Sequence, residues 1–172
     1  MREHYIASAL ARKFNASLHF NTSDDLAKWD FVLYSIEDAW ATSVEMQDDY
    51  YMKTEDDSIC LELLTHIDEH TSKNGKLNYT KAKRLLYVIN NMNLILSLKV
   101  SKLRQLVAVL ESVGKLQTYT PHDFDAWRAT HDTNPTTCAL VPMKNVLLND
   151  PNASVFTFDE LQIPHNYKQL KL

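Results

Sequence analysis

The sequence predicts an α/β protein with a mixed central sheet flanked by helices. Two apolar stripes at helical spacing lie near residues 3–15 and 100–115, and short apolar strands separated by polar breaks lie between them. Because helices and strands alternate along the chain, we expect the helices to cover the faces of one sheet. With 172 residues the chain can bury a core of its own, so residues 1–160 are predicted to form one domain and residues 161–172 a basic tail.

The first half of the chain predicts one helix followed by strands. The helix at residues 3–15 has its apolar side chains on one stripe: Tyr5, Ile6, Leu10 and Phe14. A short strand is expected at residues 17–20, and residues 22–29 could add a helical turn. Three strands follow, at residues 29–36, 41–47 and 58–64. The polar segment 51–58 suits a hairpin or a longer loop between the second and the third of them.

The second half predicts two more strands and the clearest helix. Residues 65–79 contain a glycine in a polar run and are expected to be a loop. Thr80 could cap a short helix before a strand at residues 85–89, and a turn at residues 90–93 leads to a strand at 94–100. The helix at residues 100–115 has Ser101 as its expected N-cap and Gly114 as its stop. Further elements are expected in three segments, at residues 121–132, 138–148 and 154–161.

Composition excludes several classes of protein. Two glycines in the whole chain leave no phosphate-binding glycine loop and no dinucleotide fingerprint. Cys60 and Cys138 match no metal spacing, and Cys60 is expected to be a buried, reduced thiol. No signal peptide is expected at the start and no run approaches the roughly 18 apolar residues of a membrane span. We therefore expect an intracellular, cytoplasmic protein without a membrane partner; the composition also gives an impression of viral or mobile-element origin.

The charges are segregated along the chain although the net charge is only −4. Residues 23–70 contain 14 acidic and 2 basic side chains, whereas residues 71–115 contain 9 basic and 1 acidic side chain. Such segregation could combine a cation-binding site with a phosphate-binding surface, or the two regions could simply neutralise each other. The basic candidates for phosphate contacts are Lys73, Lys76, Lys81, Lys83 and Arg84, which could equally be ordinary solvated side chains.

Three polar residues at the predicted strands suggest a metal site. Asp30 opens one strand, and Glu45 and Gln47 lie two residues apart on the next, so they share one face of it. An aspartate facing this pair could gather oxygen ligands around a divalent cation. The alternative is that Asp30 is a turn or capping residue and that Gln47 is a surface amide.

These residues and this order of elements resemble the PD-(D/E)XK nuclease superfamily, which includes restriction endonucleases and Holliday-junction resolvases. The resemblance covers about residues 1–115, with weaker similarity over residues 138–148 to the trailing segment of some phage-type members. It implies a restriction-endonuclease-like fold, Mg²⁺ or Mn²⁺ bound by Asp30 and Glu45, and hydrolysis of DNA, with Gln47 as the third catalytic residue. In that family the first helix supplies a glutamate, for which Glu3 is the candidate. Many members are dimers.

Gln47 stands where the family has a lysine, and Trp29 stands where it often has a proline. A lysine would stabilise the attacking water and the charge that develops on the phosphate, whereas glutamine can only form hydrogen bonds. Some restriction enzymes of the family carry glutamine there, and Lys53 or Lys81 could substitute for the missing cation. The alternative hypothesis is a catalytically inactive relative that binds a protein or nucleic acid, for example as an acidic mimic of phosphate.

Other acidic residues and the histidines give weaker signals. Glu62 could be a further metal ligand or an outward-facing strand residue. His66 and His70 have the i,i+4 spacing of a helical zinc site, but the polar segment around them favours a loop.

Overall fold

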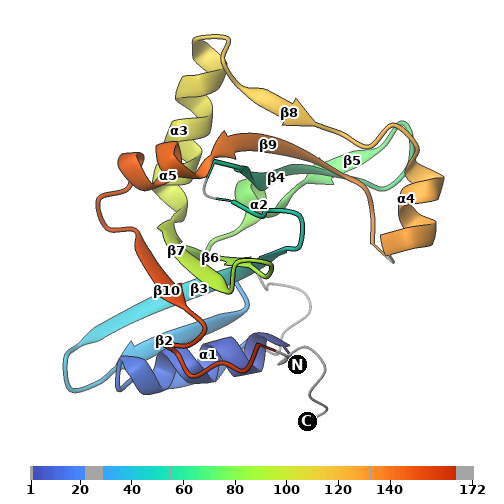
Figure 1. Cartoon of the computed structure of the whole chain (residues 1–172). Helices are drawn as coiled ribbons and strands as arrows, with labels where there is room; N and C mark the ends of the chain where they lie inside the picture. Colours follow the sequence, from blue (N-terminus) through green and yellow to red (C-terminus); the bar gives the residue numbers. More distant parts are fainter. Residues whose placement is uncertain (1, 22–28, 55, 132, 166–172) are drawn as a thin grey trace. The chain divides into compact units, whose positions relative to one another are not determined.

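The computed structural model describes residues 2–21, 29–54, 56–131 and 133–165. The chain divides into two compact units. The first unit comprises Met1–Lys53, Lys81–Val100 and Asn152–Leu172, and the second comprises Thr54–Thr80 and Ser101–Pro151. Figure 1 labels the helices and strands of both. Both units are mixed α/β, as the sequence predicts, whereas the single domain over residues 1–160 stays a prediction.

A mixed sheet with a helix against it forms the first unit. In its described part, α1 (Arg2–Lys13) precedes six strands: β1 (Ser17–Phe20), β2 (Phe31–Ser35), β3 (Trp40–Asp49), β6 (Arg84–Ile89), β7 (Leu94–Lys99) and β10 (Ser154–Thr157). Their order in the sheet is β1-β2-β3-β6-β7-β10. The strands predicted in these segments and the first helix are therefore confirmed, while the helical turn predicted at residues 22–29 lies almost entirely outside the described residues.

Strand β3 lies in the middle of this sheet between an antiparallel and a parallel neighbour. It pairs antiparallel with β2, where Phe31 lies opposite Val44, and parallel with β6, where Gln47 lies beside Tyr87. Because side chains alternate along a strand, one face of β3 carries Glu45, Gln47 and Asp49 and the other carries Val44 and Met46. Both faces of β3 are buried from Val44 to Gln47, so the polar residues Glu45 and Gln47 are as inaccessible as the apolar residues between which they lie.

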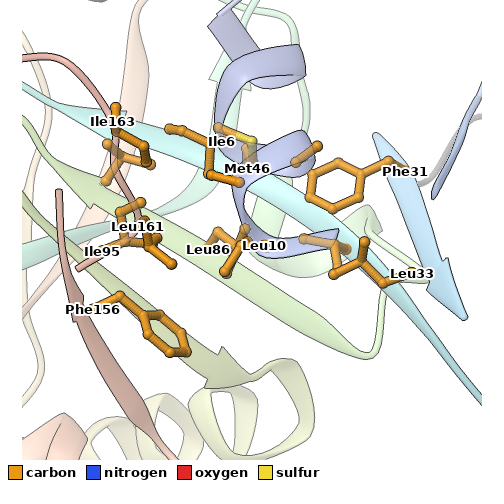
Figure 2. Packing of buried hydrophobic residues seen from close by; sticks show 14 of the residues in the cluster. Ile6, Leu10, Phe31, Leu33, Met46, Leu86, Ile95, Phe156, Leu161 and Ile163 are labelled. Carbon is orange, nitrogen blue, oxygen red and sulfur yellow. The ribbon is translucent and has the colours of Figure 1, made fainter. Parts of the chain in front are cut away.

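The core of the first unit lies on the Val44 face. Ile6 and Leu10 of α1 contact a cluster that includes Phe31, Met46 and Leu86, as Figure 2 shows. Apolar residues at helical spacing on α1 thus pack against apolar residues at strand spacing, as the sequence pattern predicts. Leu161 and Ile163 also belong to this core, each 3% exposed, so the predicted tail begins inside the packed structure; residues 166–172 lie outside the described residues.

The second unit has its own antiparallel sheet. Its strand order is β5-β4-β9-β8, with β4 at Ser58–His66, β5 at Ser72–Asn74, β8 at Gln117–Tyr119 and β9 at Thr136–Pro142. Its helices are α2 (Lys76–Tyr79), α3 (Val100–Ser112, of which Val100 belongs to the first unit), α4 (Phe124–His131) and α5 (Met143–Asn149). Strand β4 therefore does not continue the sheet of β2 and β3, because it pairs with a strand that comes 78 residues later in the chain.

A disulfide joins β4 to β9. Cys60 and Cys138 lie on these neighbouring strands with their Cα atoms 5.4 Å apart, and they form a disulfide bond. The prediction that Cys60 is a reduced thiol is wrong. The disulfide could not be predicted from the sequence, because only the antiparallel register of β4 and β9 brings residues so distant in the chain together.

Residues 65–79 are more regular than the predicted loop. They contain the end of β4, all of β5 and the short helix α2. At Gly75, which precedes α2, an added Cβ would meet main-chain atoms of Glu62 and Leu63 at 2.8 Å, so only glycine allows this close approach to β4. Thr80 ends α2 and does not cap a following helix.

Helix α3 confirms the strongest helical pattern of the sequence. It begins at Val100, so Ser101 is its second residue and not its cap, and it is followed by Gly114 at a φ of +67°. Its Arg104 donates hydrogen bonds to the main-chain oxygens of Leu77 (2.8 Å) and Thr80 (2.6 Å). A cation thus binds the carbonyl groups that the end of α2 leaves exposed.

Along the described parts of the chain, we find no helix with the length and apolar character that crossing a bilayer requires.

Candidate functional site on strand β3

The Asp30 side chain is fixed on the main chain of β3 at the peptide group that follows Glu45. Asp30 precedes β2, and its Oδ2 accepts a hydrogen bond of 2.6 Å from the main-chain N–H of Met46. Its own N–H donates to the oxygen of Val44 at 2.8 Å. The Asp30 carboxylate therefore binds the peptide group that joins Glu45 to Met46, and it continues the pairing of β2 with β3 by one further hydrogen bond.

Glu45 and Gln47 are both buried on β3. Glu45 is 3% exposed and Gln47 is 7% exposed, so the alternative interpretation of Gln47 as a surface amide is wrong. A buried carboxylate is stable only when it is hydrogen-bonded, paired or bound to a cation. The burial of these two polar residues, next to an aspartate from the neighbouring strand, distinguishes this position from an ordinary solvated strand.

Two residues that sequence reasoning missed extend this polar face. Asp49 is 7% exposed, and its Oδ2 accepts a short hydrogen bond from the hydroxyl of Tyr87, which is fully buried on β6. Its Oδ1 accepts hydrogen bonds from the N–H groups of Tyr51 (2.7 Å) and Met52 (2.9 Å). The signal was present in the sequence, because Asp49 continues the two-residue spacing of Glu45 and Gln47.

The ends of β3 and β6 are tied together next to this face. The Asn90 amide donates to Oδ1 of Asp48 at 3.0 Å and to the main-chain oxygen of Asp49 at 3.2 Å. Asn90 also donates its main-chain N–H to the same oxygen of Asp49 at 2.9 Å. These bonds fix the carboxyl ends of two parallel strands, which is where ligands commonly bind in α/β sheets.

The carboxylates of Asp30 and Glu45 have the chemistry of a Mg²⁺ or Mn²⁺ site. Both offer hard oxygen donors of the kind that these cations prefer. The described residues contain no group of three or more His, Cys, Asp or Glu side chains arranged to hold a metal ion. A cation here would thus take two carboxylates from the protein, with the remaining ligands from water and phosphate, as is usual for Mg²⁺.

The predicted basic residues are divided between the two units. Lys73 and Lys76 belong to the second unit, whereas Lys81, Lys83 and Arg84 belong to the first. Lys73, Lys81 and Lys83 are exposed, and Lys76 is half-buried. Arg84 pairs with Val44, so it lies on the sheet face opposite to Glu45 and cannot act beside it.

The weaker candidates belong to other elements than β2 and β3. Glu3 is exposed on α1, and Glu62 lies on β4 in the second unit. His66 ends β4 and its Nε2 forms a hydrogen bond of 2.7 Å with Thr137, while His70 is exposed in the bend that follows. The two histidines therefore do not have the helical arrangement that their spacing would need for zinc.

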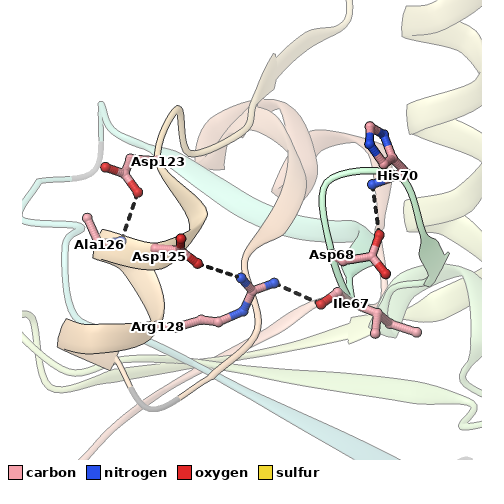
Figure 3. A network of polar contacts seen from close by, with 7 residues as sticks. All are labelled: Ile67, Asp68, His70, Asp123, Asp125, Ala126 and Arg128. Atoms are coloured by element: carbon pink, nitrogen blue, oxygen red, sulfur yellow. Dashed lines mark hydrogen bonds and ion pairs between the residues drawn. The ribbon is translucent and has the colours of Figure 1, made fainter.

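A second polar region lies in the second unit around α4, where a groove of about 720 Å³ is lined by residues that include His122, Asp123 and Arg128. Figure 3 shows how its polar groups are used. Asp123 caps α4 by accepting the N–H of Ala126 at 2.8 Å, and Arg128 connects Asp125 (3.3 Å) to the main-chain oxygen of Ile67 (2.8 Å).

The carboxylate of Asp68 stabilises the bend between β4 and β5. It accepts the N–H groups of His70 (2.8 Å) and Thr71 (2.7 Å), and the first of these hydrogen bonds is the main reason that the pKa of Asp68 lies below its ordinary value. The three aspartates that Figure 3 shows thus have structural partners: Asp123 and Asp125 bind groups of α4, and Asp68 binds the bend that follows β4.

We compared the chain with models of protein families, with curated proteins and with solved structures, and none of the three comparisons gives a match.

Proposed function

We propose that this protein is a metal-dependent nuclease that hydrolyses DNA phosphodiester bonds. The observation that carries the proposal is the hydrogen bond between the Asp30 carboxylate and the peptide group after Glu45, since it ties an acidic side chain to the main chain of the neighbouring strand at the position of Glu45. The helix, the antiparallel β1-β2-β3 meander and the parallel strand β6 beside β3 also agree with a restriction-endonuclease-like fold.

In this proposal Asp30 and Glu45 bind Mg²⁺ or Mn²⁺, and Gln47 orients the attacking water by hydrogen bonding. The cation, when bound, supplies positive charge that stabilises the scissile phosphate in the transition state. The hydrogen bond from Met46 holds Asp30 in one orientation, and Glu45 precedes Met46 on β3 and is 3% exposed. The exposed Lys73, Lys81 and Lys83 are available for contacts with the phosphate backbone, and a homodimer would provide one site for each strand.

The proposal is tested by cleavage of plasmid and branched DNA with Mg²⁺ or Mn²⁺. Asp30→Asn and Glu45→Gln should each reduce the cleavage rate at least about a hundredfold, because each removes a charged metal ligand and keeps the shape of the side chain. Asn can still accept the hydrogen bond from Met46, so this variant separates catalysis from folding.

Glu62→Gln is the matched control, since it removes a partly buried glutamate from strand β4 of the second unit. It should cut DNA at the rate of the unmodified protein. Isothermal calorimetry with Mn²⁺ adds a readout that is independent of the substrate. The proposal is overturned if the protein cleaves no DNA and if, in addition, it shows no Mn²⁺ binding that depends on Asp30 and Glu45.

A second candidate function is favoured by the buried Gln47. In the nuclease family that the sequence resembles, this position usually carries a lysine, whereas it holds a neutral amide here. A nuclease fold without chemistry could instead bind a protein or nucleic acid. An acidic surface could then imitate phosphate in the channel of a nucleic-acid-binding partner. Recovery of a stoichiometric protein complex, combined with no Mn²⁺ binding, would favour this candidate over the nuclease.

A further inference from the structure

The first unit contains a cavity of about 250 Å³ on the sheet face opposite to Glu45. The residues that line it belong to this unit and come from α1, from strands β2, β3, β6, β7 and β10, and from the segment that precedes β10. Leu10, Leu33 and Leu86 belong to its wall, and Figure 2 shows how they converge between the helix and the sheet. An apolar cavity of about 150 Å³ is large enough for benzene, so this volume has room for a compound of one or two fused rings.

The exposure of the wall increases from the floor of the cavity to its mouth. Leu10, Val44 and Leu86 are each 2% exposed, so they form a floor that is shielded from bulk water. Phe14 is 46% exposed and Trp40 is half-buried, so these two aromatic side chains lie on the open side. An entering ligand therefore passes aromatic rings and buries its far end against aliphatic side chains.

Aromatic rings determine the shape of ligand that the cavity favours. Phe14 of α1 and Phe156 of β10 both line it, and their rings meet edge-on with centres 5.9 Å apart. Trp40 of β3 adds a third ring. A flat aromatic ligand can form the offset or edge-to-face contacts that such rings prefer. It also loses less conformational entropy on binding than a flexible chain of the same size, so the wall favours a planar, rigid ligand.

Arg84 also lines the cavity, and other groups of the first unit hold its side chain. Its Nε donates to Oγ of Ser97 at 2.7 Å, and its Nη2 donates to the main-chain oxygen of Asn152 at 2.8 Å. An uncharged ligand needs no counter-charge from this guanidinium and leaves these hydrogen bonds in place. Burial of apolar surface then supplies the affinity, whereas polar atoms of a ligand would lose their water among apolar side chains.

We propose that this cavity binds a small uncharged aromatic compound of two fused rings, of the chemical class to which indole belongs. Its rings pack against Phe14, Trp40 and Phe156, and its far edge reaches the aliphatic floor. The cavity lies on the face of β3 opposite to Glu45, so this binding is independent of the proposed nuclease activity.

The test titrates ¹⁵N-labelled protein with unlabelled indole at neutral pH and follows the side-chain N–H signals of the tryptophans by NMR. Trp40 lines the cavity, whereas Trp29 precedes β2 and Trp127 lies on α4 of the second unit, so the last two signals are internal controls. Indole should shift the Trp40 signal saturably, with a Kd of about 1 mM or tighter. Purine has the same two-ring shape but more ring nitrogens, which lose hydrogen bonds to water on burial, so it should bind at least about tenfold more weakly.

Two variants of neighbouring residues on β3 locate the site. Thr42→Phe places a ring in the cavity and should abolish the saturable Trp40 shift. Ala41→Phe is the matched control, because Ala41 is exposed on the other face of the same strand, and it should leave the affinity for indole unchanged. A Trp40 shift that does not saturate, or equal affinities of indole and purine for the unmodified protein, would overturn the proposal even if Thr42→Phe did not fold. Loss of indole binding in a folded Ala41→Phe variant would overturn it as well.

Discussion

The carboxylate of Asp30 lies 2.6 Å from the main-chain nitrogen of Met46, and this contact joins the start of β2 to the centre of β3. The Asp30 side chain accepts the N–H of Met46 in place of a main-chain oxygen of β2. The same hydrogen bond therefore stabilises the sheet and brings Asp30 next to Glu45, so a structural and a proposed catalytic role meet in one residue.

Asp30→Ala should lower the free energy of unfolding by about 1–2 kcal/mol, because it leaves the N–H of Met46 without its acceptor. Asp30→Asn keeps an oxygen at this position and should cost less than half as much. Urea unfolding followed by circular dichroism measures both. Equal stabilities of the two variants would contradict a structural role for this hydrogen bond.

Gln47→Lys should increase the rate of Mg²⁺-dependent DNA cleavage about tenfold or more, since an ammonium group can stabilise charge that an amide cannot. Gln47→Met, which has a similar length but neither charge nor hydrogen bonds, should reduce the rate instead. Single-turnover cleavage of a plasmid provides the measurement. A folded Gln47→Lys variant that cuts no faster than the unmodified protein would argue that this position does not face the reaction.

Tyr87→Phe should destabilise the first unit by about 1.5–3 kcal/mol, because it removes the hydroxyl that donates to the buried carboxylate of Asp49. Tyr119→Phe is the matched control, since Tyr119 on β8 is 46% exposed, and it should change stability by less than about 0.5 kcal/mol. Denaturant unfolding compares the two. Similar effects of both substitutions would exclude a special contribution from the Asp49–Tyr87 pair.

Loss of the disulfide should destabilise the second unit by about 2–5 kcal/mol, since Cys60 and Cys138 close a long loop between β4 and β9. The Cys60→Ser, Cys138→Ser double variant and the protein treated with dithiothreitol should unfold at similar urea concentrations. Peptide mapping by mass spectrometry without reduction checks the bond itself. If the untreated protein has two titratable thiols, the disulfide is absent in solution.

Glu160 should titrate below its ordinary value. The side-chain hydrogen bond from Lys13 is the main reason that its pKa is lowered, so this interaction stabilises the folded state at pH values above the ordinary value of 4.5 and is lost as the pH falls through the lowered pKa. Lys13→Met should return the pKa of Glu160 toward 4.5. Carbon-detected NMR titration follows it, with Asp68 as the internal reference, because the pKa of Asp68 is lowered mainly by the N–H of His70 and should not move.

Local patterns in the sequence predicted most of the elements, because each pattern reports on which side of an element is buried. Tyr5, Ile6 and Leu10 predicted α1, and the alternation around Glu45 predicted β3. The pairing of strands depends on residues far apart in the chain, and there the predictions failed. Strand β4 was expected to follow β3 in one sheet, yet its partner is β9, and only that pairing explains the disulfide.

At the candidate site, too, the sequence predicted individual residues but not their contacts. The sequence named Asp30, Glu45 and Gln47, but it could not show that Met46 orients Asp30, or that Asp49 and Tyr87 extend the polar face. Arg84 was grouped with four lysines by its charge alone. The parallel register of β3 and β6 puts it on the other face of the sheet, in the wall of an apolar cavity.

By itself, the sequence predicted an α/β protein and most of its helices and strands, and it suggested which acidic residues could act together. The tertiary structure decided which strands are neighbours, that the chain forms two compact units, and which face of the sheet each polar side chain occupies. The physical reason is that burial of one side of a helix or strand produces a periodic pattern of apolar residues in the local sequence. Pairing between distant strands depends instead on main-chain hydrogen bonds, which are nearly independent of side-chain identity.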